Sequence, residues 1–346
     1  MSELRYDPLK QTWVVIADHP GSRPGEFLLD RIQQTMTLCP FCVGQEHRTP
    51  PELFAIRDAG SHANGPGWQV RVMPNKYPTF GIEGDQAHRG VGLYDVKQGI
   101  GAHEVVVETP DHDRHPADLT PQDWVNVLRA WRSRLLDLRR DTRFRDIFVF
   151  KNHGLEAGAV IPHSHSQIMA VPTMPPLLAT ELNSNLDHFL AKERCLHCDL
   201  LLQERETGDG VVRDDGQYLV YSPFASRYPF ELRIVPIRHQ HDFAIIGDER
   251  LLPLGEAIHE TLQRIRSALR DPPMNLLLVT APPEHPRVGR PEFWNSLHFD
   301  FHWYLEIVPC LKRMAGFERS TGFHLNSTLP SEAARFLREA ELQIDS

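Results

Sequence analysis

Residues 158–172 read GAVIPHSHSQIMAVP, and the expected fold of the chain follows from them. Apolar residues lead into this stretch and out of it, and Pro172 ends it, a pattern typical of a buried β-strand. Because residues two apart on a strand share a face, His163, His165 and Gln167 are expected to form one polar row. A buried polar row is unfavourable unless its groups have partners. Three such groups in register favour a functional site over a set of structural hydrogen bonds.

The bulk composition is that of an ordinary globular protein. The 346 residues include 41% hydrophobic residues and carry a formal net charge of −9, which fits one large or two modest domains. A net acidic chain disfavours nucleic acid or an anionic membrane as the main partner. No run of about 18 apolar residues is present, and the first residues lack the features of a secretion signal. We therefore expect a cytoplasmic protein.

Four of the five cysteines form two C-x-x-C pairs, Cys39 with Cys42 and Cys195 with Cys198. In a reducing compartment such pairs favour metal ligation or redox chemistry over structural disulfides. A thioredoxin-like redox site would open a helix, whereas CPFC leads into EHRTPPEL, which is a poor helix. Zinc is therefore favoured over redox chemistry for this pair. Cys310 has no partner in the pattern and is expected to be an ordinary thiol on an apolar side.

The two halves of the chain repeat one order of features. In each half a C-x-x-C pair is followed by a strand with a histidine after its end, then a helix, a strand and a further histidine. Zinc favours four Cys and His ligands in a tetrahedron, and each half offers two of each. We predict two closed, structural zinc sites, formed by Cys39, Cys42, His112 and His163, and by Cys195, Cys198, His239 and His302. In the second site His241 is an alternative to His239.

The helices of both halves can be read from the sequence. Thr120 as N-cap, Pro121 at the first helical position and Asp123 three residues after the cap predict a helix start in the first half. Its counterpart in the second half lies within residues 248–271.

A strand, a helix and further strands in each half predict an α+β fold, with a mostly antiparallel sheet and flanking helices. We expect a duplicated fold with halves at 1–175 and 176–346. The two halves are expected to share one continuous sheet, because no flexible linker separates them.

His165 becomes available for chemistry if His163 binds zinc. A neutral imidazole on a metal-anchored strand, next to Gln167, suits nucleophilic attack on phosphorus. The second half has Tyr304 and Glu306 at the corresponding places. Only the first half is therefore expected to be catalytic.

Four segments, CPFC, TPDH, FKNHG and especially HSHSQ, resemble the galactose-1-phosphate uridylyltransferase family, the transferase branch of the histidine-triad superfamily. The resemblance covers nearly the whole chain and implies a duplicated histidine-triad-like fold. It also implies that His165 attacks the α-phosphorus of a nucleotide sugar and forms a nucleotidyl-histidine intermediate. A second sugar phosphate, or phosphate, then takes the nucleotidyl group. Gln167 replaces the third histidine of the hydrolases, and its amide would hold the phosphoryl oxygens.

The resemblance further implies a homodimer with shared sites and a set of substrate-binding residues. These are Arg23, Asn75, Lys76, Asn152, Gly158, Ala159, Val160, Gln167, Phe317 and Glu318. The main-chain N–H groups at 158 to 160 are expected to cradle phosphates. For Arg23 and Lys76 the alternative is an ordinary surface charge, and for Phe317 a place in the core. Glu181 matches a family carboxylate that can bind a second metal, but the second C-x-x-C pair is the favoured ligand set.

Two departures from the best-known family pattern concern the nucleotide. Ser164 stands between the two histidines, where that pattern has proline, and the second C-x-x-C pair resembles relatives that act as ADP-glucose phosphorylases. The first hypothesis is a UDP-glucose–hexose-1-phosphate uridylyltransferase. The second is an ADP-glucose phosphorylase or related adenylyltransferase of the same mechanism. A third, a zinc-stabilised nucleotide-binding module without activity, is disfavoured because His165 and Gln167 are intact.

Overall fold

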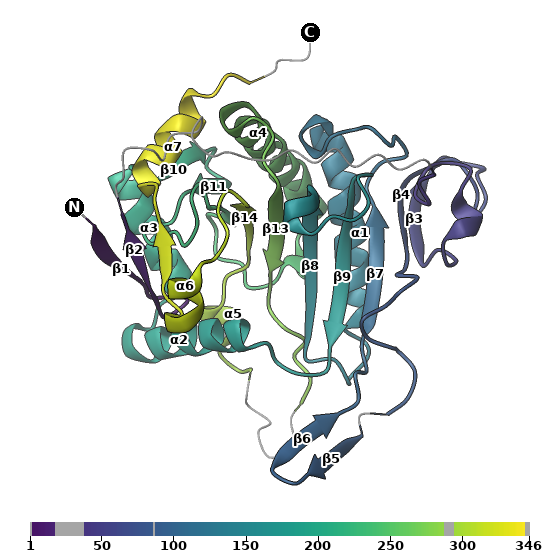
Figure 1. Cartoon of the computed structure of the whole chain (residues 1–346), viewed down its shortest axis with the longest axis horizontal. Coiled ribbons are helices and arrows are strands. Elements are labelled where there is room, and N and C mark those ends of the chain that lie inside the picture. Colours follow the sequence, from purple (N-terminus) through teal and green to yellow (C-terminus); the bar gives the residue numbers. More distant parts are fainter. Residues whose placement is uncertain (1, 18–37, 86, 287–293, 343–346) are drawn as a thin grey trace.

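The computed structural model describes residues 2–17, 38–85, 87–286 and 294–342. Within these residues, ten strands form one sheet in which every neighbouring pair is antiparallel (Figure 1). The first half of the chain contributes β3 (Phe54–Arg57), β4 (Trp68–Pro74), β7 (Ala102–Val107), β8 (Asp146–His153) and β9 (His165–Val171). The second half contributes β10 (Val211–Asp214), β11 (Tyr218–Tyr221), β12 (Leu232–Pro236), β13 (Met274–Val279) and β14 (Tyr304–Pro309).

The strand order is the same in both halves when it is followed outward from the centre. One side runs β8-β9-β7-β4-β3 and the other β13-β14-β12-β11-β10. The pairing of β8 with β13, with Asn152 opposite Asn275, joins the two units. The predicted duplicated α+β fold with one continuous sheet is thereby confirmed. The division at residue 175 falls between β9 and α2 (Pro176–Lys192) and stays a prediction.

Two long helices, α1 (Pro121–Leu138) and α4 (Leu251–Leu269), pack against each other and cover one face of the sheet. The predicted start of α1 is confirmed. Thr120 Oγ1 accepts a hydrogen bond from the Asp123 N–H, and the Asp123 carboxylate accepts one from the Thr120 N–H. Trp124 and Trp131 of α1 are fully buried against strand side chains. This layer is the main hydrophobic core of both halves.

Further elements surround this core. They are α3 (Leu196–Thr207), α5 (Leu297–Asp300), α6 (Gly316–Thr321), α7 (Pro330–Glu339) and the hairpin of β5 (His88–Val91) and β6 (Tyr94–Lys97), which projects from the body (Figure 1). A small sheet joins β1 (Glu3–Asp7) and β2 (Thr12–Ile16) to β15 (His324–Asn326). The first strands therefore pack with elements of the second half. Among the described helices, none is both long and apolar enough to cross a bilayer.

The decisive stretch is a strand only in its second part, because β9 begins at His165. The expectation of a strand from residue 158 was wrong for its first seven residues. Gly158 has a left-handed backbone with φ of 94°, and Pro162 has no N–H with which to join a ladder. His163 therefore lies in the loop that enters the strand, while His165 and Gln167 lie on the strand itself.

Candidate functional site

His165 is held as a neutral imidazole whose proton position is fixed. Its Nδ1 lies 2.8 Å from the main-chain oxygen of His163. A carbonyl oxygen only accepts hydrogen bonds, so Nδ1 carries the proton and Nε2 keeps its lone pair. Burial, which leaves 8% of the residue exposed, lowers the pKa of His165 to about 4. At neutral pH the site therefore offers an uncharged nucleophilic nitrogen.

A cavity of about 480 Å³ opens beside His165. Five of the predicted substrate-binding residues line it together with His165, namely Asn75, Lys76, Gly158, Val160 and Gln167. The strand β9 supplies His165 and Gln167, two residues apart and on one face. The loop before β9 supplies Gly158 and Val160, and the turn after β4 supplies Asn75 and Lys76. Segments from across the first half thus meet at one imidazole.

The loop before β9 is closed by its own hydrogen bonds. The Gly158 N–H donates to Leu155 O at 2.9 Å, and the Ala159 N–H donates to Gly154 O at 3.0 Å. Ala159 is buried and is absent from the described lining of the cavity. Both N–H groups are engaged inside the turn, so their expected contact with phosphate would need shared hydrogen bonds.

Asn152 braces this loop from the sheet. Its Oδ1 accepts a hydrogen bond from Asn275 Nδ2 at 2.8 Å, and the same Asn275 amide donates to Ala157 O at 2.9 Å. A Cβ on Gly158 would lie 3.2 Å from Asn152 Nδ2, so the loop packs directly on this side chain. Asn152 is not one of the described residues that line the cavity beside His165. The structure therefore places it behind the loop.

Phe317 and Glu318 lie in α6, and neither is among the described residues that line the cavity of His165. The Glu318 carboxylate accepts a hydrogen bond from the Ala315 N–H at 3.0 Å, and this contact caps the start of α6. The same carboxylate forms an ion pair with Lys312. Phe317 is 47% exposed and is not a core residue. Within one chain these two residues are not brought together with His165. Arg23 lies outside the described residues.

The first cysteine pair meets both of its expected histidines. Cys42 Sγ lies 3.3 Å from His112 Nδ1, and His163 Nδ1 lies 3.7 Å from Cys39 Sγ and 3.8 Å from Cys42 Sγ. His163 Nε2 lies 2.8 Å from Thr109 O, so it carries the proton and leaves Nδ1 free to ligate. Burial disfavours the thiolate of Cys39 and raises its pKa to about 11. A bound cation would stabilise that thiolate. The donor set fits a closed four-coordinate cation.

The second pair forms an equivalent cluster with His239 and His302. Cys198 Sγ lies 3.4 Å from His239 Nδ1 and 3.6 Å from His302 Nδ1. A hydrogen bond with the Cys195 thiol, and then those with the two imidazoles, lower the pKa of Cys198, which favours its thiolate form. His239 Nε2 is hydrogen-bonded to a main-chain oxygen at 2.9 Å. His241 instead groups with two other side chains, so the structure places His239 in this cluster.

The place in the second half that corresponds to His165 and Gln167 is filled by buried charges. Lys10 Nζ lies 2.7 Å from Glu306 Oε1 and 3.5 Å from Glu181 Oε1, and Arg227 donates to Glu306 at 2.7 Å. The Tyr304 hydroxyl donates to Glu181 at 3.0 Å. Glu181 therefore has a lysine and a phenol as partners. This half presents no imidazole like His165 among its described residues.

Sequence reasoning missed a buried ion pair directly behind the two histidines. Lys151 Nζ lies 2.5 Å from Glu108 Oε2, and it donates to Ser164 Oγ at 2.9 Å and to His165 O at 3.2 Å. All three donors of the ammonium are thereby used. The sequence does contain an indication of this ion pair. Lys151 lies within the apolar strand DIFVFKN, and a lysine in a buried strand needs a partner of opposite charge.

A third group, His115, His153 and Asp271, was also missed. The Ala117 N–H donates to His115 Nδ1, so His115 Nε2 carries the proton and donates to Asp271 Oδ1 at 2.7 Å. His153 Nε2 lies 3.1 Å from the same oxygen. A metal ligand normally donates its other ring N–H, which His115 does not. The cluster is therefore a hydrogen-bonded link between the segment before α1, the end of β8 and the residues after α4.

Comparisons with known proteins identify relatives over nearly the whole chain. Residues 62–175 match the family model described as galactose-1-phosphate uridyl transferase, N-terminal domain. The chain is 33% identical to an ADP-glucose phosphorylase of Arabidopsis thaliana, over 98% of this chain and 93% of that protein. It is 28% identical to a galactose-1-phosphate uridylyltransferase of Thermotoga maritima, over 99% and 100%. A crystal structure of an Arabidopsis ADP-glucose phosphorylase with bound ADP-glucose superposes with a TM-score of 0.81 at 30% identity, covering 99% of this chain and 100% of that one.

Proposed function

The chain belongs to the galactose-1-phosphate uridylyltransferase family and is a nucleotidyltransferase, and on this basis we propose that it works through a covalent intermediate on His165. One observation carries the proposal. The proton of His165 is held on Nδ1 by the His163 carbonyl, which leaves the Nε2 lone pair beside a cavity that Gln167 also lines. A neutral nucleophile of this kind needs no separate base to remove a proton before it attacks.

In the first half-reaction His165 Nε2 attacks the α-phosphorus of a nucleotide sugar. A P–N bond forms, the P–O bond to the sugar phosphate breaks, and the sugar 1-phosphate leaves with the electron pair. The imidazole becomes cationic, and its Nδ1–H stays bonded to the His163 carbonyl. In the second half-reaction a phosphate oxygen of the acceptor attacks phosphorus and releases neutral His165. Gln167 donates from its amide to the phosphoryl oxygens, and the kinetics are ping-pong.

Two nucleotide sugars are candidates for the donor. The family model and the Thermotoga relative support UDP-glucose, with a hexose 1-phosphate as acceptor. The Arabidopsis relative and the second Cys–His cluster support ADP-glucose, with phosphate as acceptor. Both use the same chemistry at phosphorus, so His165 has the same role in either case.

We propose that both Cys–His clusters hold zinc. With Zn–S of about 2.3 Å and Zn–N of about 2.0–2.1 Å, adjacent sulfur and nitrogen ligands of a tetrahedral zinc lie roughly 3.6 Å apart. The sulfur–nitrogen separations of 3.3 to 3.8 Å in the two clusters support that ion. Four protein ligands close each site. Zinc would therefore anchor the segments around β9 and β14 and take no part in the reaction.

A homodimer would give Phe317 and Glu318 a role at the site. One chain keeps both residues away from its own His165 cavity, and Phe317 is exposed. A second subunit could bring α6 to that cavity, with Glu318 holding the start of the helix as it does here. The dimer and the cytoplasmic location stay predictions, and sedimentation equilibrium tests the first of them.

Trapping of the intermediate tests the proposed function. Protein incubated with UDP-glucose or ADP-glucose, each radiolabelled in the α-phosphate, is quenched at alkaline pH, and the labelled peptide is identified. We expect label on His165 from one of the two donors, and none in His165→Gly, whose fold and zinc content are retained. The matched control is His88→Gly in the exposed β5 strand, which should label normally. An unlabelled wild-type protein, or full labelling of His165→Gly, contradicts the proposal.

A further inference from the structure

His103 is the neighbour that determines how the Gln167 amide is turned. His103 lies on β7, opposite Met169 of β9, and is 9% exposed. The Thr79 N–H donates to His103 Nδ1 at 3.2 Å. A ring nitrogen that accepts a hydrogen bond has no proton, so the proton of the neutral ring is on Nε2. His103 Nε2 lies 2.7 Å from Gln167 Oε1, and the imidazole therefore donates to the amide oxygen.

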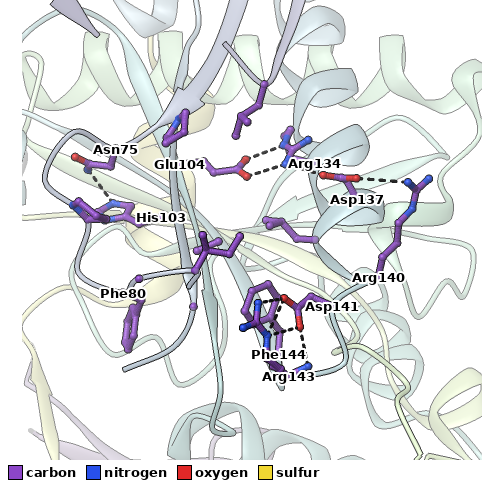
Figure 2. A pocket seen from close by; sticks show the side chains of 18 of the residues that line it. Asn75, Phe80, His103, Glu104, Arg134, Asp137, Arg140, Asp141, Arg143 and Phe144 are labelled. Atoms are coloured by element: carbon purple, nitrogen blue, oxygen red, sulfur yellow. Dashed lines mark hydrogen bonds and ion pairs between the residues drawn. The ribbon is translucent and has the colours of Figure 1, made fainter. Parts of the chain in front are cut away.

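Asn75, the other polar neighbour of His103, leaves this assignment unchanged. Asn75 and His103 also line a second cavity, which Figure 2 shows from close by. In that view Asn75 lies beside His103, while Glu104, the next residue along β7, points toward Arg134. Asn75 Oδ1 accepts from the Tyr77 N–H at 2.9 Å, so the group that lies 3.1 Å from His103 Nε2 is the amide nitrogen. With the proton on Nε2, both groups are donors, so the 3.1 Å approach of Asn75 Nδ2 is a close contact and not a hydrogen bond. Asn75 therefore offers the Nε2 proton no acceptor. The proton is directed to Gln167.

The polarity of the Gln167 amide follows from this contact. A primary amide has an oxygen acceptor on one side and an NH₂ donor on the other. Because His103 holds the oxygen, the NH₂ group is the one left for the cavity that Gln167 shares with His165. An NH₂ group there stabilises the oxygens of a transferring phosphoryl group, whereas an amide oxygen would repel them.

We propose that His103 is a positioning residue for nucleotidyl transfer, which acts by fixing the donor side of the Gln167 amide toward the phosphoryl group. The inference rests on the proposed function of His165 and adds a residue that does not itself touch the substrate. It also gives a reason for an imidazole between Ala102 and Glu104 on a strand whose residues are all buried.

Two variants of nearly equal shape test which side of the Gln167 amide faces the cavity. His103→Gln keeps an NH₂ donor for the Gln167 oxygen, whereas His103→Glu offers only oxygen acceptors and would turn the amide around. From the strength of hydrogen bonds to charged groups, we expect single-turnover labelling of His165 to slow by no more than about 5-fold in His103→Gln and by at least about 50-fold in His103→Glu. The loss should fall on kcat more than on KM. A purely structural role predicts equal effects, which would overturn the proposal.

Repeating the test in a protein without the Gln167 amide separates the orientation of that amide from direct charge repulsion by the Glu side chain at residue 103. The same two substitutions are made in Gln167→Ala protein, which lacks the amide. If His103 acts through Gln167, the difference between the Gln and Glu variants shrinks to less than about 3-fold. A difference that persists would contradict the proposal. Wild-type protein without label would instead overturn the function of His165, so the two failures are distinguishable.

Discussion

At the scale of single residues, main-chain atoms decide which nitrogen of each imidazole carries the proton. The His163 carbonyl holds the proton of His165 on Nδ1, and the Thr109 carbonyl holds that of His163 on Nε2. The Thr79 N–H leaves the proton of His103 on Nε2. Because an N–H only donates and a carbonyl only accepts, the fold assigns three different roles to three neighbouring histidines. They are proposed nucleophile, proposed ligand and proposed positioning residue.

Lys151 is the buried cation whose loss should cost the most stability near the two histidines. The residue is 2% exposed, and its ammonium pairs with Glu108 beneath the two histidines. In Lys151→Met the Glu108 charge stays buried without its partner, and we expect the free energy of unfolding to fall by about 3–5 kcal/mol. Urea denaturation followed by circular dichroism measures this value.

Two further proteins serve as controls for Lys151. Lys151→Met combined with Glu108→Met removes both charges and should recover more than half of the loss. Arg129→Met removes an exposed partner of Asp248 and should change stability by less than about 1 kcal/mol. A loss below 1 kcal/mol in Lys151→Met alone would show that water reaches the Glu108 carboxylate.

At the scale of elements, each Cys–His cluster ties a short segment to the sheet. Cys39 and Cys42 lie in turns ahead of β3, and Cys195 is the N-cap of α3. His163 and His302 lie just before β9 and β14. The segment around Cys39 and Cys42 has only turns and bends near the sulfurs, whereas Cys198 lies within α3. A bound ion would therefore fix the position of the first segment and would tie the start of α3 to β14 in the second.

Single cysteine substitutions test the two clusters separately. We expect two zinc ions per chain in the wild-type protein and one in Cys39→Ser or in Cys195→Ser, with each variant less stable by at least about 2 kcal/mol because a structural metal is lost. Cys310→Ser is the matched control and should keep both ions, since Cys310 belongs to neither cluster. Elemental analysis by mass spectrometry gives the counts. A wild-type protein without zinc would rule out both sites.

At the scale of the whole molecule, α1 and α4 join the two halves across the seam between β8 and β13. The helices approach closely at Gly255. A Cβ there would lie 2.6 Å from Pro121 O and 3.3 Å from Trp124 Cβ. The contact with a main-chain oxygen cannot be relieved by a side-chain rotation, so the two helices would have to move apart.

Gly255→Ala is therefore expected to destabilise the protein, although the same substitution inside a helix is usually stabilising. Glycine to alanine inside a helix ordinarily stabilises by about 0.5–1 kcal/mol. Here we expect a loss of about 1–3 kcal/mol, because overpacking at Pro121 outweighs that gain. Gly316→Ala in α6 is the control, since no described atom lies within 4 Å of its Cβ, and it should be neutral or slightly stabilising. Thermal unfolding compares the two. A more stable Gly255→Ala protein would contradict the close packing.

Features that depend on local spacing follow from the amino-acid sequence alone. The capping residues of α1, the two C-x-x-C pairs with their histidines, the duplicated order of strands and helices, and the pair of His165 and Gln167 all follow from residues a few positions apart or from a repeated pattern. These rules need no knowledge of which distant segments meet. The helices α2 and α3, whose sequences lack a strong cap, were not foreseen.

Which distant side chains become partners depends on how the chain folds. It paired Lys10 with Glu306, placed Thr79 and Gln167 on the two nitrogens of His103, and kept Phe317 away from His165 within one chain. Such contacts arise when strands far apart in the chain come together in one sheet, and no local period encodes them. The chemistry of the candidate site therefore rests on its sequence, whereas its proton positions and charge pairs rest on the fold.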